Sequence, residues 1–218
     1  MTRPRQALVA AATAALVALA GGCSTLRQTL PGLGGGDHGR TLSIAILPLA
    51  YRDDSGGLPC DLCPDKLVMA PTSRDDALLV TAFFYEALES HPRFTVMPEE
   101  VVNSVLDRSL AGAAERLRAR GDVDAVLTGG LLELRPRVGD PRAPERRAGA
   151  AVYAALIRLS DGEVLWKAFY DEDDRPRGRF RSQIGRLVGE GRDLGRTAVE
   201  VARGEVVRMV SELVDRVR

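Results

Sequence analysis

Residues 41–49, TLSIAILPL, constrain the fold more than any other segment, because apolar side chains occupy both odd and even positions. Successive side chains of a strand point to opposite faces of its sheet. The apolar residues therefore fall on two faces, with Leu42, Ile44 and Ile46 on one and Ala45 and Leu47 on the other. A strand that is apolar on both faces is typical of a sheet that is covered on both sides.

The rest of the chain alternates between helical and extended patterns. A helix that follows Ser73 is apolar nearly all round, which indicates burial. Gly129 and Gly130 interrupt a long strand and indicate a bulge or a close backbone approach. The polar residues 139–147 predict a loop, and Ser160–Gly162 predicts a hairpin turn. In chain order, the expected elements are strand 41–49, helix 77–90, strand 93–97, helices 98–106 and 111–120, strands 124–138, 148–159 and 163–171, and helix 194–217.

This order, β-α-β-α-β-β-β-α, predicts an α/β (α+β) fold with a single mixed sheet of about five strands and helices packed on it. We expect residues 41–218 to form one domain, since this length supports a single sizeable core. Residues 51–72 are rich in Gly, Pro and Asp and exceed the usual length of a connection. This loop is therefore a candidate working surface.

The first 22 residues are typical of a secretory signal. Arg3 and Arg5 precede an apolar stretch, 7–20, that is shorter than the roughly 20 residues a spanning helix needs. The segment LAGGC, 19–23, resembles the bacterial lipobox, in which a signal peptidase cuts before a cysteine that carries lipid. We therefore expect a lipoprotein signal over 1–22, a lipidated Cys23 and a Gly-rich flexible tether over 23–40. The alternatives are an ordinary cleaved signal and a membrane helix.

Location and partners follow from this anchor and from the charge. Ser24 stands where an aspartate would retain many such lipoproteins in the inner membrane, so we expect the periplasmic face of the outer membrane. The predicted partners are the membrane, through lipid on Cys23, and other envelope proteins or a second copy of the chain. The formal net charge is zero, which argues against a nucleic-acid partner.

Cys60 and Cys63 are the sharpest local feature of the domain. In an oxidising compartment, cysteines with this spacing can form a short disulfide that staples the loop. A thioredoxin-like redox pair would place the first cysteine at a helix N-terminus, whereas Pro59 and Pro64 bracket this pair. A zinc site would need two further ligands, and free thiols are the remaining alternative.

The sequence offers little for catalysis, so we expect a non-enzyme with no cofactor and no metal. It contains no nucleophile-elbow, phosphate-loop or His-Glu-x-x-His motif. His38 lies in the expected tether and His91 precedes a proline. The acidic run Asp171–Asp174 is interpreted as a solvated turn after a strand, with a calcium site as the alternative.

Binding residues are expected on two apolar stripes. Along the strand 163–171, one face carries Val164, Trp166, Ala168 and Tyr170, and the other carries Leu165 and Phe169. One face is expected in the core and the other is a candidate interaction surface. The second stripe, which includes Phe180, Ile184 and Leu187, lies among arginines. It could pack on a membrane, on a neighbouring subunit or on its own domain. The interaction candidates are Trp166, Tyr170, Phe180, Ile184 and Leu187.

Three segments are familiar in combination: IAILPL at 44–49, DVDAVLTGGLLEL at 122–134 and LSDGEVLWKAFYD at 159–171. Together they resemble the periplasmic α/β domain of CsgG-like and related outer-membrane lipoproteins. That group includes the curli secretion channel, an activator of a peptidoglycan synthase and the Pel polysaccharide export lipoprotein. Leu49 stands where the group usually has Phe.

Three functions remain open at the level of sequence. The first is a lipid-anchored, non-catalytic component of assembly, secretion or regulation at the outer membrane. The resemblance implies the second, a subunit of an oligomeric secretion ring or channel. The third is a thiol-redox protein that uses Cys60 and Cys63.

Overall fold

The computed structural model describes residues 41–63, 65–107, 109–140, 143–174 and 196–217. The predicted signal peptide, Cys23 and the tether lie outside these residues, as do Phe180, Ile184 and Leu187. The elements in chain order are β1 (Leu42–Ile46), α1 (Arg74–Glu89), β2 (Phe94–Val96), α2 (Glu99–Val105), α3 (Leu110–Arg120), β3 (Ala125–Arg135), β4 (Val138–Asp140), β5 (Ala143–Arg146), β6 (Gly149–Arg158), β7 (Val164–Asp173) and α4 (Ala198–Arg216).

The main sheet has five strands in the order β2-β1-β3-β6-β7. β1 pairs in parallel with both β2 and β3, whereas β3, β6 and β7 are antiparallel neighbours. The mixed α/β sheet predicted from the sequence is therefore confirmed, with the strand of residues 41–49 inside it. The backbones of β3 and β6 approach closely at Gly129, where a Cβ would lie 2.1 Å from the carbonyl oxygen of Tyr153.

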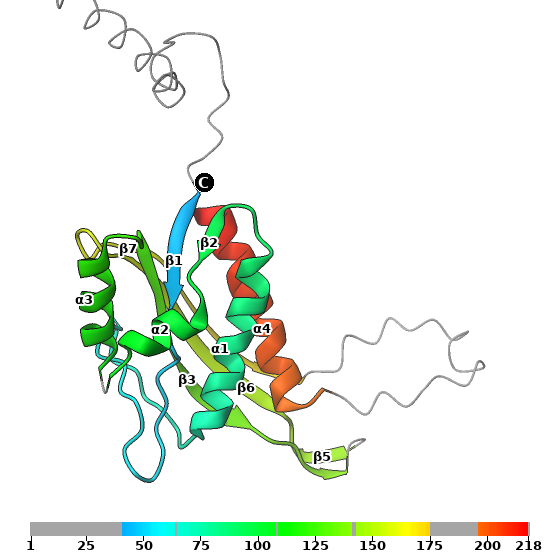
Figure 1. The fold of residues 1–218 in the computed structure, drawn as a ribbon. Coiled ribbons are helices and arrows are strands. Elements are labelled where there is room, and N and C mark those ends of the chain that lie inside the picture. The colour runs from blue at the N-terminus through cyan, green and yellow to red at the C-terminus, as the bar shows by residue number, and fades with distance from the viewer. Residues whose placement is uncertain (1–40, 64, 108, 141–142, 175–195, 218) are drawn as a thin grey trace, which may run out of the picture. The chain divides into compact units, whose positions relative to one another are not determined.

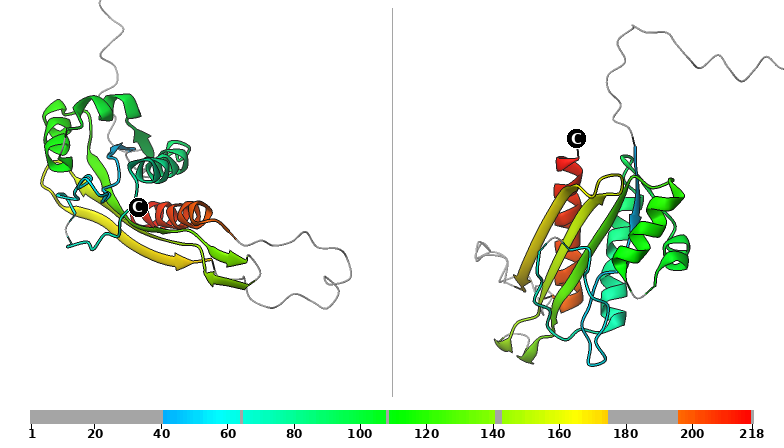
Figure 2. Two further views of the ribbon diagram at one scale, coloured as in Figure 1. Left: turned by 90° about the horizontal axis from the view of Figure 1, so that it is seen from below. Right: turned by 90° about the vertical axis from the view of Figure 1, so that its left-hand side faces the viewer.

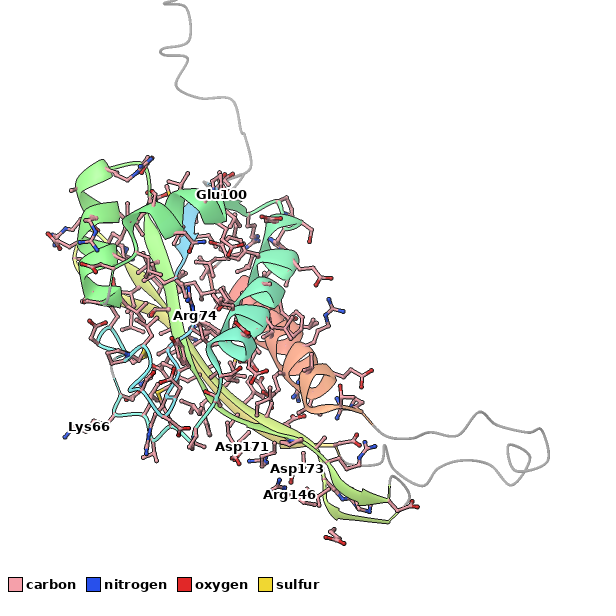
Figure 3. The ribbon with its side chains drawn as sticks, turned by 60° about the horizontal axis from the view of Figure 1, so that its bottom comes forward. Lys66, Arg74, Glu100, Arg146, Asp171 and Asp173 are labelled. Atoms are coloured by element: carbon pink, nitrogen blue, oxygen red, sulfur yellow. A yellow bond between two sulfur atoms is a disulfide. The ribbon has the colours of Figure 1, made fainter. Side chains whose placement is uncertain are left out.

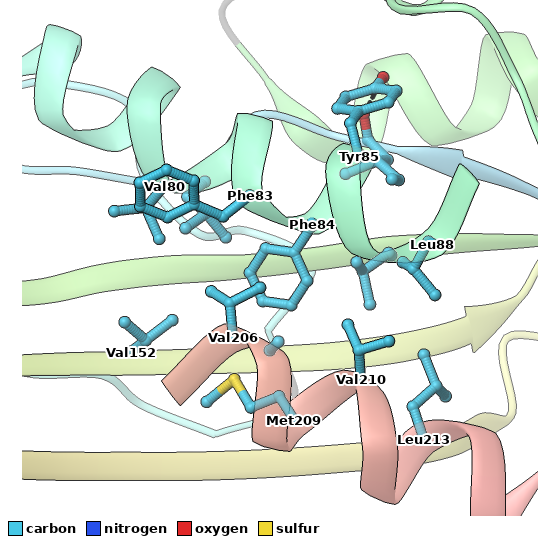
Figure 4. Close-up of a cluster of buried hydrophobic side chains, with 14 of the residues drawn as sticks. Val80, Phe83, Phe84, Tyr85, Leu88, Val152, Val206, Met209, Val210 and Leu213 are labelled. Atoms are coloured by element: carbon cyan, nitrogen blue, oxygen red, sulfur yellow. Dashed lines mark hydrogen bonds between the residues drawn. The ribbon is translucent and has the colours of Figure 1, made fainter. Parts of the chain in front are cut away.

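Two hydrophobic cores lie on opposite faces of this sheet. α1 and α4 cover one face, and Phe84 of α1 lies close to Val206 and Met209 of α4 (Figure 4). α2, α3 and the loop after β1 cover the other face, where Leu47, Val126 and Leu117 are buried. Figure 2 shows the helices of the two layers separated by the sheet. Successive side chains of β1 point alternately into the two cores, with Ile44 and Ile46 in one and Ala45 in the other, which is the physical basis for both layers.

Local signals define the helix ends. The side chains of Ser73, Ser109 and Thr197 accept hydrogen bonds from the backbone of α1, α3 and α4, respectively. Thr197 and Glu200 form a complete capping box. Gly121 ends α3 with φ 75°, a left-handed conformation that favours glycine. These side chains satisfy backbone groups that a helix end leaves without partners.

The prediction of a loop over 139–147 was wrong. β4 and β5 form a two-stranded ribbon in this segment, beyond the end of the main sheet (Figure 1). Val138, Gly139 and Asp140 are all exposed, so no buried face imposes apolar alternation. A ribbon without a buried face has the composition of a loop, which explains the error.

Candidate interaction surface

Two aspartates fix the long loop after β1 to neighbouring elements, Asp61 to α3 and Asp65 to the sheet. The carboxylate of Asp61 accepts hydrogen bonds from the Ser109 hydroxyl at 2.5 Å and from the backbone N–H of Ala111 at 3.0 Å, both at the start of α3. The carboxylate of Asp65 accepts from Lys167 Nζ at 2.8 Å and from the Tyr153 hydroxyl at 3.3 Å. The loop therefore joins α3, β6 and β7.

The charges of these contacts follow from their partners. Hydrogen bonding by the Lys167 ammonium holds the pKa of Asp65 below its usual range. Burial and the nearby Asp65 carboxylate raise the pKa of Tyr153 to about 12. Tyr153 therefore stays a neutral donor at physiological pH.

Cys60 and Cys63 form a disulfide in this loop, with their Cα atoms 5.3 Å apart. Both residues are partly buried against the core on the α2 and α3 face. Neither cysteine begins a helix, since the next helix, α1, starts at Arg74. This placement differs from the helix N-terminus that activates redox cysteines.

β7 places its aromatic residues in two environments. Trp166 is 7% exposed and belongs to the core beneath α4. Tyr170 packs against α4, where its hydroxyl hydrogen-bonds Glu212 and the Arg208 guanidinium lies 4.7 Å from its ring centroid. A partner role for Trp166 and Tyr170 remains a prediction, and their present contacts are with their own domain.

Phe169 is 57% exposed on the opposite face of β7, at the edge of the sheet. Its neighbours two positions away on the same face are Lys167 and Asp171, whose side chains are about half exposed. We name these three residues the β7 patch. The patch places an exposed aromatic ring between a cation and an anion.

Arg135 organises the acidic end of β7. It forms ion pairs with Glu133 at 2.5 Å, Asp171 at 2.9 Å and Asp173 at 2.8 Å. Burial opposes its charge, but these hydrogen bonds outweigh that effect and raise its pKa. Figure 3 shows Asp171 and Asp173 close to Arg146. A hollow of about 540 Å³ lies there. Its lining residues are Arg135, Glu145, Arg146, Arg147, Asp171 and Asp173. Asp171–Asp173 thus belong to a strand, which corrects the prediction of a solvated turn.

Glu205 of α4 is fully buried, with Oε1 accepting a hydrogen bond from the backbone N–H of Glu172 at 3.0 Å. Its Oε2 has no hydrogen-bond partner among the described residues. Burial raises the pKa of Glu205 to about 9, so the side chain is a neutral acid at physiological pH. The sequence reasoning missed Glu205, although a single carboxylate inside the apolar stripe of the last helix was a visible signal.

A crevice of about 640 Å³ lies at the C-terminal end of β1, between α1 and α2. Ligands of α/β sheets often bind where neighbouring strands send their connections to opposite faces. Its polar lining comes from Arg74 (Figure 3), Glu99, Asn103 and Asp107, all exposed and mixed in charge. These groups do not define a ligand class, and they differ from the buried groups that typify catalytic sites.

Two kinds of feature are absent from the described residues. No group of three or more His, Cys, Asp or Glu side chains there is arranged to hold a metal ion. Within the same residues, every helix is too short or too polar to cross a membrane.

Comparison with known proteins gives matches by structure only. No family model and no curated protein matches the sequence. The solved PelC dodecamer from Paraburkholderia phytofirmans is similar, with a TM-score of 0.45 and 15% identity over 78% of this chain and 86% of that chain. Lipoprotein GNA1162 from Neisseria meningitidis has a TM-score of 0.40 and 19% identity over 67% of this chain and 90% of its own. The LpoB C-terminal domain from Escherichia coli has a TM-score of 0.38 and 13% identity over 61% of this chain and 82% of that chain.

These scores and identities do not assign the chain to a family. The resemblance to CsgG-like lipoproteins therefore stays a prediction.

Proposed function

We propose that this chain is a lipid-anchored, non-catalytic component of a bacterial envelope, held at the periplasmic face of the outer membrane. The observation that carries the proposal is the LAGGC segment, 19–23, after a positively charged start and a short apolar stretch. Several acyl chains on Cys23 would hold the protein far more firmly than one chain. Residues 23–40 would tether the domain, 41–218, to the bilayer.

The domain supplies two supporting observations. A disulfide between Cys60 and Cys63 suits an exported protein, because disulfides persist in oxidising compartments. The β7 patch offers an exposed aromatic side chain for protein contacts. The proposed role is to take part in assembly, secretion or regulation through such contacts rather than through chemistry.

Mass spectrometry of the native protein tests the anchor. The expected N-terminus is a lipidated Cys23, and the Cys23→Ala variant should lose both cleavage and lipid. The matched control is the Cys60→Ser, Cys63→Ser double variant, which removes the other cysteines and should keep the lipid. A mature protein that is freely soluble and begins with an unmodified residue would refute the proposal.

Membrane fractionation tests the location. We expect the parent chain in the outer membrane and the Ser24→Asp variant in the inner membrane, because aspartate after the lipidated cysteine retains many lipoproteins there. Equal distribution of the two proteins would show that position 24 does not set the destination.

A further inference from the structure

The outer edge of β7 is a free strand edge within the part of the chain that the structure describes. There, β7 pairs only with β6, at the end of the five-stranded sheet (Figure 2). The strand is ten residues long. A long free edge presents unpaired N–H and C=O groups that can hydrogen-bond another strand.

The pairing with β6 indicates which groups face this edge. The backbone N–H of Asp174 donates to the carbonyl oxygen of Ala148 at 2.7 Å, next to the paired residues Gly149 and Asp173. In an antiparallel ladder, the backbone groups of alternate residues point to opposite sides of the strand. The N–H and C=O groups of Lys167, Phe169 and Asp171 therefore point away from β6.

We propose that two copies of this chain pair antiparallel through β7, about a two-fold axis at Phe169. This register places Phe169 opposite Phe169 of the second copy. It also places Lys167 of each copy opposite Asp171 of the other. The strand thus matches itself in backbone direction, in aromatic contact and in charge, as a two-fold interface requires.

The neighbouring registers are less favourable. A shift of two residues in one direction sets Phe169 opposite Asp171. The same shift in the other direction sets Lys167 opposite Phe169. Either shift separates the two aromatic rings. The first shift keeps Lys167 opposite a carboxylate, that of Asp173, whereas the second shift removes both Lys–Asp pairs. Odd shifts place backbone groups that point toward β6 opposite groups that point to the edge, so they break the ladder.

The intramolecular contacts of the patch are compatible with this pairing. Lys167 bonds Asp65, but its side chain is 51% exposed and an ammonium has three donors. Asp171 bonds Arg135 through Oδ1, and its side chain is 49% exposed. Both side chains therefore keep donor or acceptor capacity for a second copy.

Charge reversal in the full-length lipidated protein, purified in detergent, tests the register. Lys167→Asp and Asp171→Lys each replace two attractive pairs by two repulsive pairs, so each should weaken the dimer about tenfold or more in sedimentation equilibrium. The Lys167→Asp, Asp171→Lys double variant restores opposite charges and should recover the parent's affinity to within about threefold. Circular dichroism melts establish that each variant is folded.

The matched control is Asp65→Asn, which weakens the intramolecular contact of Lys167 without changing the patch. We expect it to leave dimerisation unchanged. If it weakens the dimer as much as Lys167→Asp does, the intermolecular pair is refuted. A monomeric parent, or a double variant no better than either single variant, also refutes the proposal.

Disulfide trapping in intact cells gives an independent readout. Phe169→Cys should oxidise to a covalent dimer, because residue 169 faces itself across the axis. Val164→Cys, exposed on the same strand, should not, because it lies five residues from the axis. Equal trapping of the two variants would refute the register. The pairing does not depend on the lipid, so this failure would leave the lipidated N-terminus, and with it the proposed function, unaffected.

Discussion

At the scale of single residues, Glu205 is a group whose charge state depends strongly on folding. Its carboxyl is fully buried, and its pKa is raised to about 9 from the 4.5 of an exposed glutamate. Burial is the main cause, and the charges of Glu172 and Asp171 add to it, while the Glu172 N–H and Arg208 oppose it. Between these two pKa values, the folded chain keeps a proton that the unfolded chain loses.

We expect Glu205→Gln to remove a pH dependence of stability. In the parent, the contribution of Glu205 is complete below about pH 4.5 and is lost as pH rises toward about 9. The loss is at most about 1.4 kcal/mol per pH unit in this window. The glutamine stays neutral and keeps an oxygen for the Glu172 N–H. The free energy of unfolding of the variant should therefore increase relative to that of the parent as pH rises.

Urea unfolding of both proteins at pH 5, 7 and 8.5 measures this difference. Other carboxylates titrate alike in the two proteins and cancel. Parallel pH profiles would show that Glu205 does not carry its proton into the folded state.

At the scale of elements, the loop after β1 replaces a helix as the cover of the sheet near β6 and β7. Asp61 and Asp65 fix this loop to α3, β6 and β7. The disulfide between Cys60 and Cys63 stiffens the short segment that contains Asp61. The loop is therefore held by these side chains and by single backbone hydrogen bonds, such as that from the Ala70 N–H to the Leu132 carbonyl oxygen at 2.8 Å, rather than by a regular ladder.

The Cys60→Ser, Cys63→Ser double variant should lose about 2 kcal/mol of stability, because the disulfide closes a short loop. Urea unfolding without reductant measures the loss, and the parent protein with reductant should match the variant. Because the loop is structural here, the variant should complement a gene deletion as well as the parent does. Failure to complement despite a folded domain would favour the thiol-redox alternative.

The elements show which sequence signals suffice. The capping residue Ser73 and the C-terminal Gly121 were each sufficient to predict a helix end, because each acts through nearby backbone groups. The two-faced apolar pattern of β1 was sufficient to predict a covered strand, because both of its faces are buried. The β4–β5 ribbon was missed because it has no buried face. Alternation also separated Phe169 from Trp166, but only the position of α4 shows which of the two is covered.

At the scale of the whole molecule, the five-stranded sheet separates two cores that share few side chains. Ile46 belongs to the core beneath α1 and α4, and Ile157 belongs to the core beneath α2, α3 and the loop. β3 lies between their strands in the sheet. Substitutions on opposite faces without shared partners act almost independently.

Ile46→Val and Ile157→Val should each lower the free energy of unfolding by about 1 kcal/mol, since each removes one buried methyl group. The double variant should lose the sum of the two, to within about 0.5 kcal/mol.

Urea unfolding followed by both circular dichroism and Trp166 fluorescence measures this sum and the cooperativity together. The two probes should give one coincident transition, because both cores use the same five strands. Separate transitions would mean that the two faces unfold as independent units, and a larger coupling would mean that the sheet transmits repacking from one face to the other.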